Sequence, residues 1–351
     1  MAYINFKPRD YYSTKLYTGN ASTNAVTGVG FAPAMSWFKS RSNTNSHAIF
    51  STPMGTYSVS PSNTAAQYNA SGDGFTSLDS DGFTFNGSGG GGGTNASGFT
   101  YSSWNWKGGT TSGITTNGST SQTPTGYSFN QTAGISVVAY TGGGTAGNAF
   151  AHGLGVAPSV VLIKSRSATE WWNCYFEAIG NTKYLMLHNN EATSTNSNRW
   201  NNTTPDAVNV TLGAAGEVNG QNGNYIAYCF APKKGFSAMG SYIGNANANG
   251  QFIYTGFKPS WVLIKNSESA QAWNVWDIDR NDVGNLSIKV LQPNATAGEG
   301  AGGDQAIDIN GNGFKIKHAS NEHNKDNSTM IYMAFADQPI IGSNGTVGLA
   351  K

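Results

Sequence analysis

Charged side chains are scarce in this sequence. Only 11% of its 351 residues are Asp, Glu, Lys or Arg, and 20 basic residues against 19 acidic ones leave a net charge of +1. Sequence-independent binding to nucleic acid needs a cluster of cations that neutralise phosphates. The longest basic run here is Lys233-Lys234. We therefore expect no nucleic-acid partner.

The sequence also lacks long apolar segments and helical periodicity, and it has only two cysteines. No apolar run approaches the length of a membrane span, and the N-terminal residues lack the apolar segment of a signal peptide. We expect no membrane insertion, and assembly in a cytoplasm. No window has the 3.6-residue apolar period of a capped helix. The two cysteines, Cys174 and Cys229, lie on apolar stretches, which favours buried free thiols; a disulfide between them is the alternative.

Glycine and aromatic residues, by contrast, are abundant. The chain contains 46 Gly, 9 Trp, 16 Tyr and 17 Phe. Disordered segments lack aromatic and β-branched residues, whereas short strands joined by Gly-, Asn- and Ser-rich turns use this combination. The composition therefore predicts an all-β protein with little helix.

One apolar segment occurs three times. Each copy begins with proline and ends six residues later with lysine: Pro33–Lys39, Pro158–Lys164 and Pro259–Lys265. A tyrosine tripeptide precedes each copy, and an aromatic segment closes it, with these tyrosines and final aromatics: Tyr17, Tyr140, Tyr242, Trp106, Phe230 and Phe335. A proline before a near-continuous apolar run is typical of a strand buried on both faces. The recurring order and spacing predict an internal triplication.

The triplication divides the chain into three homologous antiparallel β-sandwich units of jelly-roll type. The first unit spans residues 1–107, with a Gly-rich loop at 86–98, and a linker follows at 108–132. The second and third units span 133–232 and 233–339, and 340–351 form a tail. We expect the following strand residues to be almost fully buried: Leu162, Ile163, Tyr228, Phe230, Val262, Leu263 and Phe335.

Three motifs carry a resemblance to a known family: Tyr17-Thr-Gly-Asn20, Gly256-Phe-Lys-Pro-Ser-Trp-Val-Leu-Ile-Lys265 and Tyr332-Met-Ala-Phe-Ala336. Through them the whole chain resembles tandem-repeat virion structural proteins of marine tailed bacteriophages, some of which are labelled tail fibres. The first unit departs from the pattern, with Trp104-Asn-Trp-Lys107 at its closing segment. The resemblance implies a place on the exterior of a virion and no catalytic residues.

Two acidic segments are candidates for a metal site. Asp308–Gly313 begins like a calcium loop, but its twelfth position is Ala319 where calcium needs a bidentate Glu, so a turn between strands is favoured. Asp277, Asp279 and Asp282 can hold a hard cation, although a solvated turn in which they pair with Arg280 is favoured. The five histidines show no zinc-ligand spacing. We expect no metal and no cofactor.

A glycosidase pair of carboxylates is the one kind of catalytic site for which the sequence offers candidates. A glycosidase needs two carboxylates that face each other across a cleft. The sequence cannot pair its candidates, which are Glu170, Glu177, Asp206, Glu217, Asp277 and Asp279. No nucleophile elbow or phosphate-binding loop occurs in a strand–helix context. We expect no catalytic residue.

Three tryptophans are candidates for a binding surface. Adjacent strand residues point to opposite faces, so one of Trp171 and Trp172 is expected to leave its sandwich. Trp200 lies in the polar stretch Asn198–Asn202, which reads as a loop. Exposed aromatic rings stack on sugars or anchor protein interfaces. Core packing is the alternative for all three.

Binding without catalysis is therefore the predicted function, at the exterior of a tailed-phage virion. The preferred form is a tail-associated, fibre-like host-attachment module that binds a surface glycan. A capsid decoration protein that binds only other virion proteins is the alternative, and a polysaccharide-degrading tailspike comes third. The expected partners are other virion proteins and a host glycan, with a homotrimer as a candidate oligomer.

Overall fold

The computed structural model describes residues 6–72, 74–89, 93–281, 284–300 and 303–338. Antiparallel sheets make up nearly all of its regular structure. In these residues each α-helix is only four residues long: α1 (Ser197–Trp200), α2 (Gly216–Asn219) and α3 (Asn321–Asn324). None of the described helices is long and apolar enough to cross a membrane. The predicted all-β class is confirmed.

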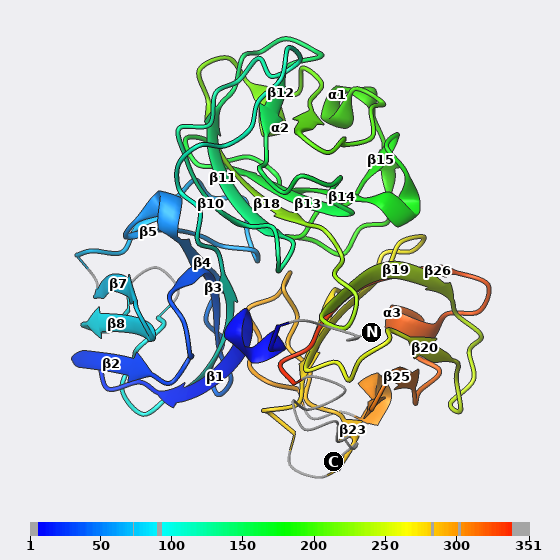
Figure 1. Ribbon diagram of the computed structural model, residues 1–351. Coiled ribbons are helices and arrows are strands. Elements are labelled where there is room, and N and C mark those ends of the chain that lie inside the picture. The colour runs from blue at the N-terminus through cyan, green and yellow to red at the C-terminus, as the bar shows by residue number, and fades with distance from the viewer. Residues whose placement is uncertain (1–5, 73, 90–92, 282–283, 301–302, 339–351) are drawn as a thin grey trace.

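Three large sheets share one order of four strands, which Figure 1 shows most clearly for unit 2. Unit 1 has β1 (Tyr12–Thr18), β9 (Thr100–Lys107), β3 (Pro33–Ser40) and β4 (Ala48–Ser51). Unit 2 has β11 (Ile135–Thr141), β18 (Asn224–Phe230), β13 (Val160–Ser165) and β14 (Asn173–Phe176). Unit 3 has β19 (Ser237–Ile243), β26 (Thr329–Phe335), β21 (Trp261–Asn266) and β22 (Asn274–Asp277). In each unit the closing strand pairs with the tyrosine strand on one side and the Pro…Lys strand on the other.

The three prolines therefore mark equivalent strands. Pro33 is the first residue of β3, and Pro158 and Pro259 each lie two residues before β13 and β21. At these positions the missing N–H of proline removes no hydrogen bond from the strand interior. The same strand order in each unit is what a triplication predicts, while the residue bounds of the domains stay a prediction.

Smaller sheets cover the outer face of each large sheet. Unit 1 has β2 (Thr23–Thr27), β8 (Gly82–Asn86) and β7 (Phe75–Asp79), and unit 2 has β12 (Ala149–Ala151) with β17 (Asn209–Thr211) and β15 (Lys183–Tyr184) with β16 (Ser194–Thr195). Unit 3 has β20 (Phe252–Tyr254), β25 (Gly313–Ile316), β24 (Ile307–Asn310) and β23 (Leu286–Ser287). Each unit is thus a two-layer sandwich.

Extra strands widen two of the large sheets. In unit 1 these are β5 (Tyr57–Val59) and β6 (Tyr68–Asn69), and in unit 2 it is β10 (Gly126–Asn130). Strand β10 lies inside the segment 108–132 that was predicted as a linker, so the last part of this connector belongs to the sheet of unit 2. Short 3₁₀ turns complete the described chain at Pro8–Asp10, Thr52–Met54, Glu177–Ile179 and Gly303–Gln305.

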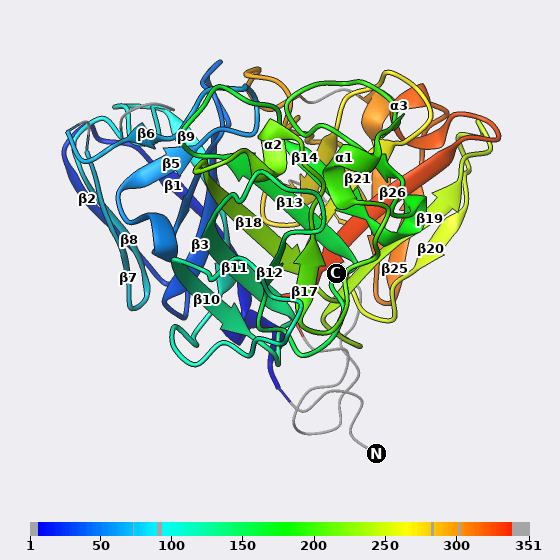
Figure 2. The same cartoon turned by 90° about the horizontal axis from the view of Figure 1, so that it is seen from above.

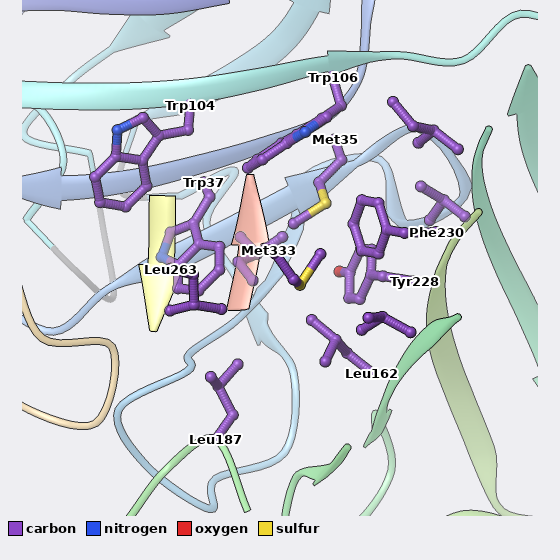
Figure 3. Packing of buried hydrophobic residues seen from close by; sticks show 14 of the residues in the cluster. Met35, Trp37, Trp104, Trp106, Leu162, Leu187, Tyr228, Phe230, Leu263 and Met333 are labelled. Carbon is purple, nitrogen blue, oxygen red and sulfur yellow. The ribbon is translucent and has the colours of Figure 1, made fainter. Parts of the chain in front are cut away.

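The three large sheets face one another across a shared core. Figures 1 and 2 show the units side by side around the centre, in blue to cyan, green, and yellow to red. The central cluster contains side chains from all three units, among them Trp37, Trp104, Leu162, Tyr228 and Leu263 (Figure 3). A separate outer cluster lies between the two layers of each unit. The molecule therefore has one core that all three units share, and each unit also has a core of its own.

Successive side chains of a Pro…Lys strand point alternately into the central core and into the outer core of its unit. In β21, Trp261 and Leu263 join the central cluster, whereas Val262 and Ile264 join the outer cluster of unit 3. A strand that is buried on both faces needs apolar residues at every position. The residues that were expected to be buried all are, at 2% exposure or less.

Candidate binding surface at a seam between units

The three seams between units are closed by equivalent hydrogen bonds. The residue just before the fourth strand of each large sheet donates a ring N–H to a carbonyl in the neighbouring unit. Trp172 Nε1 donates to Ser60 O at 2.8 Å, and Trp273 Nε1 donates to Met186 O at 3.1 Å. Unit 1 has His47 at this position, and its Nε2 lies 3.0 Å from the carbonyl oxygen of Gln292. Each unit reaches into one neighbour, so the three seams form a closed ring.

His47, like the two indoles, donates its hydrogen bond to the neighbouring unit. Its Nδ1 accepts from Trp37 Nε1 at 2.9 Å, so the ring proton lies on Nε2 and is donated to Gln292. Burial lowers the pKa of His47 well below its ordinary value, with Lys39 adding to the effect. The imidazole is therefore neutral at physiological pH.

A backbone hydrogen bond repeats at each seam as well. Gln67 N donates to Arg166 O at 3.0 Å and Thr193 N donates to Ser267 O at 2.8 Å. At the third seam Glu299 N donates to Arg41 O at 2.6 Å. Each acceptor lies two residues after the lysine of a Pro…Lys segment. These bonds fix the register of one unit against the next.

The three lysines are buried, and none of them forms an ion pair with a carboxylate of the described residues. The amines of Lys39, Lys164 and Lys265 donate to the carbonyl oxygen of the following residue at 2.8, 2.9 and 2.5 Å. Lys39 also donates to Thr296 O and Lys164 to Thr64 O, both at 3.1 Å and both across a seam. Burial lowers the pKa of Lys39 and Lys164 to about 8, and that of Lys265 to about 7.

Lys265→Met is expected to make the protein more stable than the wild type near pH 7, and this advantage should shrink as the pH rises to about 10. Burial lowers the native-state pKa of Lys265, so the unfolded chain binds the proton more strongly between pH 7 and 10.5. Wild-type stability therefore rises through this window, while the Met variant lacks this titration. One pKa unit corresponds to about 1.4 kcal/mol, so the difference should change by a few kcal/mol.

Urea unfolding of both proteins at pH 7, 8, 9 and 10 measures this difference. Taking the difference cancels the titration of cysteines and tyrosines, which is common to the two proteins. Lys183→Met, at an exposed position, is the control. A difference between Lys265→Met and wild type that stays constant over these pH values contradicts the prediction.

The structure separates the three predicted tryptophans. Trp171 is 44% exposed, whereas Trp172 and Trp200 are buried at 0% and 1%. Trp172 lies in the central core, and Trp200 packs in the outer core of unit 2, where its Nε1 donates to Lys183 O at 3.0 Å. The interpretation of Trp172 and Trp200 as surface contacts is therefore wrong, because both indoles fill cores. The expectation that one of Trp171 and Trp172 leaves the sandwich is confirmed.

Trp171 lies on the seam between units 1 and 2. Its neighbours in sequence both bind unit 1: Glu170 N donates to Thr64 O at 3.0 Å, and Trp172 Nε1 donates to Ser60 O. A second exposed aromatic residue, Tyr68 (42% exposed), follows Gln67 on the same seam. We call the group of Tyr68, Trp171, Gln67, Arg166 and Glu170 the seam surface.

The seam surface has no counterpart at the other two seams. The positions equivalent to Trp171 are Ser46 and Ala272, each two residues before a fourth strand. The positions equivalent to Tyr68 are Ser194 and Gly300. Polar groups flank the rings, since Arg166 Nε donates to Gln67 Oε1 at 2.7 Å and both side chains are partly exposed. Exposed rings next to amide, guanidinium and carboxylate groups can stack on a sugar and hydrogen-bond to its hydroxyls.

Two of the candidate carboxylates lie near each other. Burial raises the pKa of Glu170, and the neighbouring Glu217 carboxylate adds to this effect. Glu217, however, accepts two hydrogen bonds from Arg199, at 2.8 and 2.7 Å. Glycoside hydrolysis needs a free carboxylate as nucleophile or base. The bidentate pair holds Glu217 away from that role, so this arrangement favours a structural ion pair.

The remaining candidate metal and acidic segments are structural in the described chain. Residues 308–313 form the hairpin between β24 and β25, with Asn310 opposite Gly313, as the turn interpretation predicted. Asp277 is fully buried and pairs with Arg280 at 2.5 Å, so the pairing was correct; Asp277 is shielded from water, whereas Asp279 is exposed as predicted. Asp282 lies outside the described residues. No group of three or more His, Cys, Asp or Glu suited to a metal occurs in the described residues.

The other predicted features have these outcomes. Cys174 and Cys229 are both buried free thiols. Of the Gly-rich loop at 86–98, residues 90–92 lie outside the described chain, and Asn95 is fully buried. The tail at 340–351 also lies outside the described residues.

Comparison with curated proteins and with solved structures finds no match for the chain. One family model matches almost its whole length, from residue 7 to residue 339, across all three units. The match carries no assigned activity, since the family is described as a domain of unknown function. The chain belongs to the DUF7483 family.

Proposed function

We propose that this protein is a non-enzymatic structural protein of the exterior of a tailed-phage virion, where it attaches the particle to a host-surface glycan. The resemblance of its repeated motifs to virion structural proteins supports the location. The seam surface supports the binding role, and the observation that carries it is Trp171, half-exposed where the other two seams have Ser46 and Ala272.

A rigid body favours this form of binding. The closed ring of seams and the shared core hold the units in fixed positions, so a surface made from two units is ordered before a ligand arrives. Preorganised aromatic side chains lose little conformational entropy on binding. The near-neutral chain gains little from electrostatic steering. Recognition then depends on stacking and on uncharged hydrogen bonds, as glycan recognition does.

Trp171→Ala is expected to lower the rate of phage adsorption to host cells at least about tenfold, with normal particle yield. Truncating a central aromatic contact usually costs about 2 kcal/mol or more of binding free energy. Tyr68→Ala should act in the same direction. Leu286→Ala removes an apolar side chain of unit 3 that is equally exposed, at 44%, and is the control. Adsorption assays on particles that carry each variant measure the effect.

The same assays separate the alternatives. The rigid ring of three units favours a capsid decoration protein as the second candidate, because a rigid body suits lattice contacts. If the protein has this role, Trp171→Ala should leave adsorption unchanged, and loss of the whole protein should make capsids less stable to heat. A polysaccharide-degrading tailspike would release sugar fragments from host polysaccharide, and Glu170→Gln would abolish that release. Either result overturns the attachment proposal.

A further inference from the structure

Strand β12 of unit 2 is covered along its free edge by the connector that precedes the unit. Gln122 forms a parallel bridge with Phe150, and Ser121 N and Gln122 N donate to Ala149 O at 3.0 and 2.9 Å. Ser121 Oγ accepts from Ala149 N at 2.8 Å. Both outward backbone groups of Ala149 are therefore bonded to the connector. The outer sheet of unit 2 has a closed edge.

Side chains of the connector also form hydrogen bonds with unit 2. Gln122 is buried, and its Nε2 donates to Asn219 Oδ1. Asn148, just before β12, donates from Nδ2 to Ser121 Oγ at 3.3 Å. Between Gly108 and Thr125 the connector has no charged residue. An extended, uncharged segment with hydroxyl and amide side chains thus fits this edge.

Strand β20 is the equivalent strand of unit 3, and no segment of the described chain pairs with its outer edge. Ile253 pairs with Phe314 in the same way that Phe150 pairs with Val210. Thr255 N donates to Asn312 O and Ile316 N to Gln251 O, so residues 251, 253 and 255 face β25. Because backbone groups alternate in direction along a strand, the N–H and C=O groups of Phe252 and Tyr254 point away from β25. β20 is the terminal strand of its sheet.

The side chains around this edge are unusually exposed. Tyr254 and Phe252 are 65% and 44% exposed, where units 1 and 2 have small residues such as Thr27 and Ala151. Ile243, also exposed, contributes the carbonyl that accepts from Gln251 Nε2 at 2.5 Å. Native proteins usually protect edge strands with charge, proline or a covering segment. Residues 251–256 contain no charged residue and no proline.

A polar atom beside this edge also lacks a partner. Gln251 occupies the position that corresponds to Asn148, because each directly precedes its edge strand. Asn148 bonds to the connector, whereas Gln251 Oε1 is shielded from water and has no hydrogen-bond partner in the described chain. A buried acceptor without a partner is unfavourable. The Gln251 amide differs from that of Asn148, since its Nε2 donates to Ile243 O within the unit and only its Oε1 lacks a partner.

We propose that the open edge of β20 binds an extended, uncharged segment of another protein, which adds as a strand beside Phe252 and Tyr254. The segment reproduces the backbone pairing that residues 119–122 make with β12. In addition, one of its hydroxyl or amide side chains donates to Gln251 Oε1 once this amide has turned toward the segment. The uncharged edge matches an uncharged segment, as at β12, and the two exposed rings add apolar contact. The site is separate from the seam surface and requires no particular location of the protein.

The probe is a synthetic peptide with the sequence of residues 118–125, Gly-Ser-Thr-Ser-Gln-Thr-Pro-Thr. Added at millimolar concentration to the full chain, it should slow hydrogen exchange of the Phe252 and Tyr254 amides at least about tenfold. Gln251→Leu should weaken this protection about fivefold or more. Tyr254→Pro removes an outward N–H and should abolish the protection of the remaining Phe252 amide. Thr27→Pro, at the equivalent edge of unit 1, is the control and should leave the protection intact.

Three results would overturn the proposal. The first is no protection of these amides by the peptide. The second is protection in the free protein that disappears when the chain is shortened to residue 338, which would make the chain itself the occupant. The third is a concentration-dependent dimer that Tyr254→Pro dissociates, which would make a second copy the occupant. None of these results depends on the adsorption of Trp171 variants, so the two proposals fail separately.

Discussion

Replacing Phe335 by Ala is expected to lower the free energy of unfolding by about 3–5 kcal/mol, the range for large-to-small aromatic changes in packed cores. Phe335 is fully buried at the centre of the molecule. Five aromatic rings from all three units surround it at centroid distances of 5.6 to 5.8 Å: Tyr12, Trp106, Phe230, Phe236 and Trp261. No single unit can close the cavity that the truncation leaves.

Denaturant melts followed by tryptophan fluorescence measure this loss, and hydrogen exchange locates it. The most protected amides of β9, β18 and β26 should all exchange faster in Phe335→Ala, because each unit loses a contact. Phe314→Ala is the matched control, since Phe314 is equally buried but its ring contacts, Tyr242 and Tyr332, belong to unit 3. Its effect should concentrate in unit 3. A loss below about 1 kcal/mol, or faster exchange in unit 3 alone, would show that the units do not share a core.

The strands of the large sheets could be predicted because their signals are local and repeated. Proline at the start of the run, lysine at its end and apolar residues between them describe a strand buried on both faces, and β3, β13 and β21 have this form. The sequence could not show what the second face of each of these strands packs against. Leu263 lies in the central cluster together with residues of both other units, and contacts between units produce no periodic pattern in the sequence.

The burial of Trp200 could not be read from its polar neighbours. Asn196 caps the short helix α1, since its side chain accepts from Asn198 N, and this single turn directs Trp200 into the outer core of unit 2. A surface segment with one inward aromatic residue has the composition of a loop. In the structure the Trp200 ring packs against Tyr175, at 5.8 Å between ring centroids, and this contact between distant residues leaves no local signal in the sequence.

A repeated asparagine was missed although a signal was present. Asn95, Asn219 and Asn324 are fully buried, and each lies six residues before the first core residue of its closing strand. The carbonyl just before each of them accepts from the tyrosine of the tripeptide strand at 2.6 Å. The interval of six residues is visible in the sequence once the copies are aligned. Buried amides of this kind hold loops by hydrogen bonds to backbone groups.

Asp277→Ala is expected to lower the free energy of unfolding by about 3–5 kcal/mol, because it leaves a buried arginine without its counter-ion. Asp277 Oδ2 accepts from Arg280 Nε at 2.5 Å and from Trp104 Nε1 of unit 1 at 2.8 Å. Asp277 and Arg280 are both fully buried within unit 3. The change therefore removes a charge pair and a hydrogen bond across the seam between units 3 and 1.

The rest of this network cannot replace Asp277. Arg280 also donates to Glu299 at 3.0 Å, but Glu299 is shared with Arg41 of unit 1, which donates to it at 3.2 and 3.0 Å. One carboxylate then faces two guanidinium groups, and only that of Arg280 is fully buried. Asp277→Asn should cost less than Asp277→Ala, since an amide oxygen can still accept from Trp104.

Urea unfolding of the Asp277 variants tests this account, together with a double-mutant cycle that includes Arg280→Ala. The cycle should give a coupling free energy of about 2–3 kcal/mol between the two side chains, at the upper end for contacting pairs. Asp308→Ala in the same unit is the matched control: its ion pair with Lys317, at 3.4 Å, is partly exposed, so its loss should cost less than about 1 kcal/mol. Equal losses for Asp277→Ala and Asp308→Ala would mean that water reaches Arg280 after the change, and that the buried pair adds little to the stability of the seam between units 3 and 1.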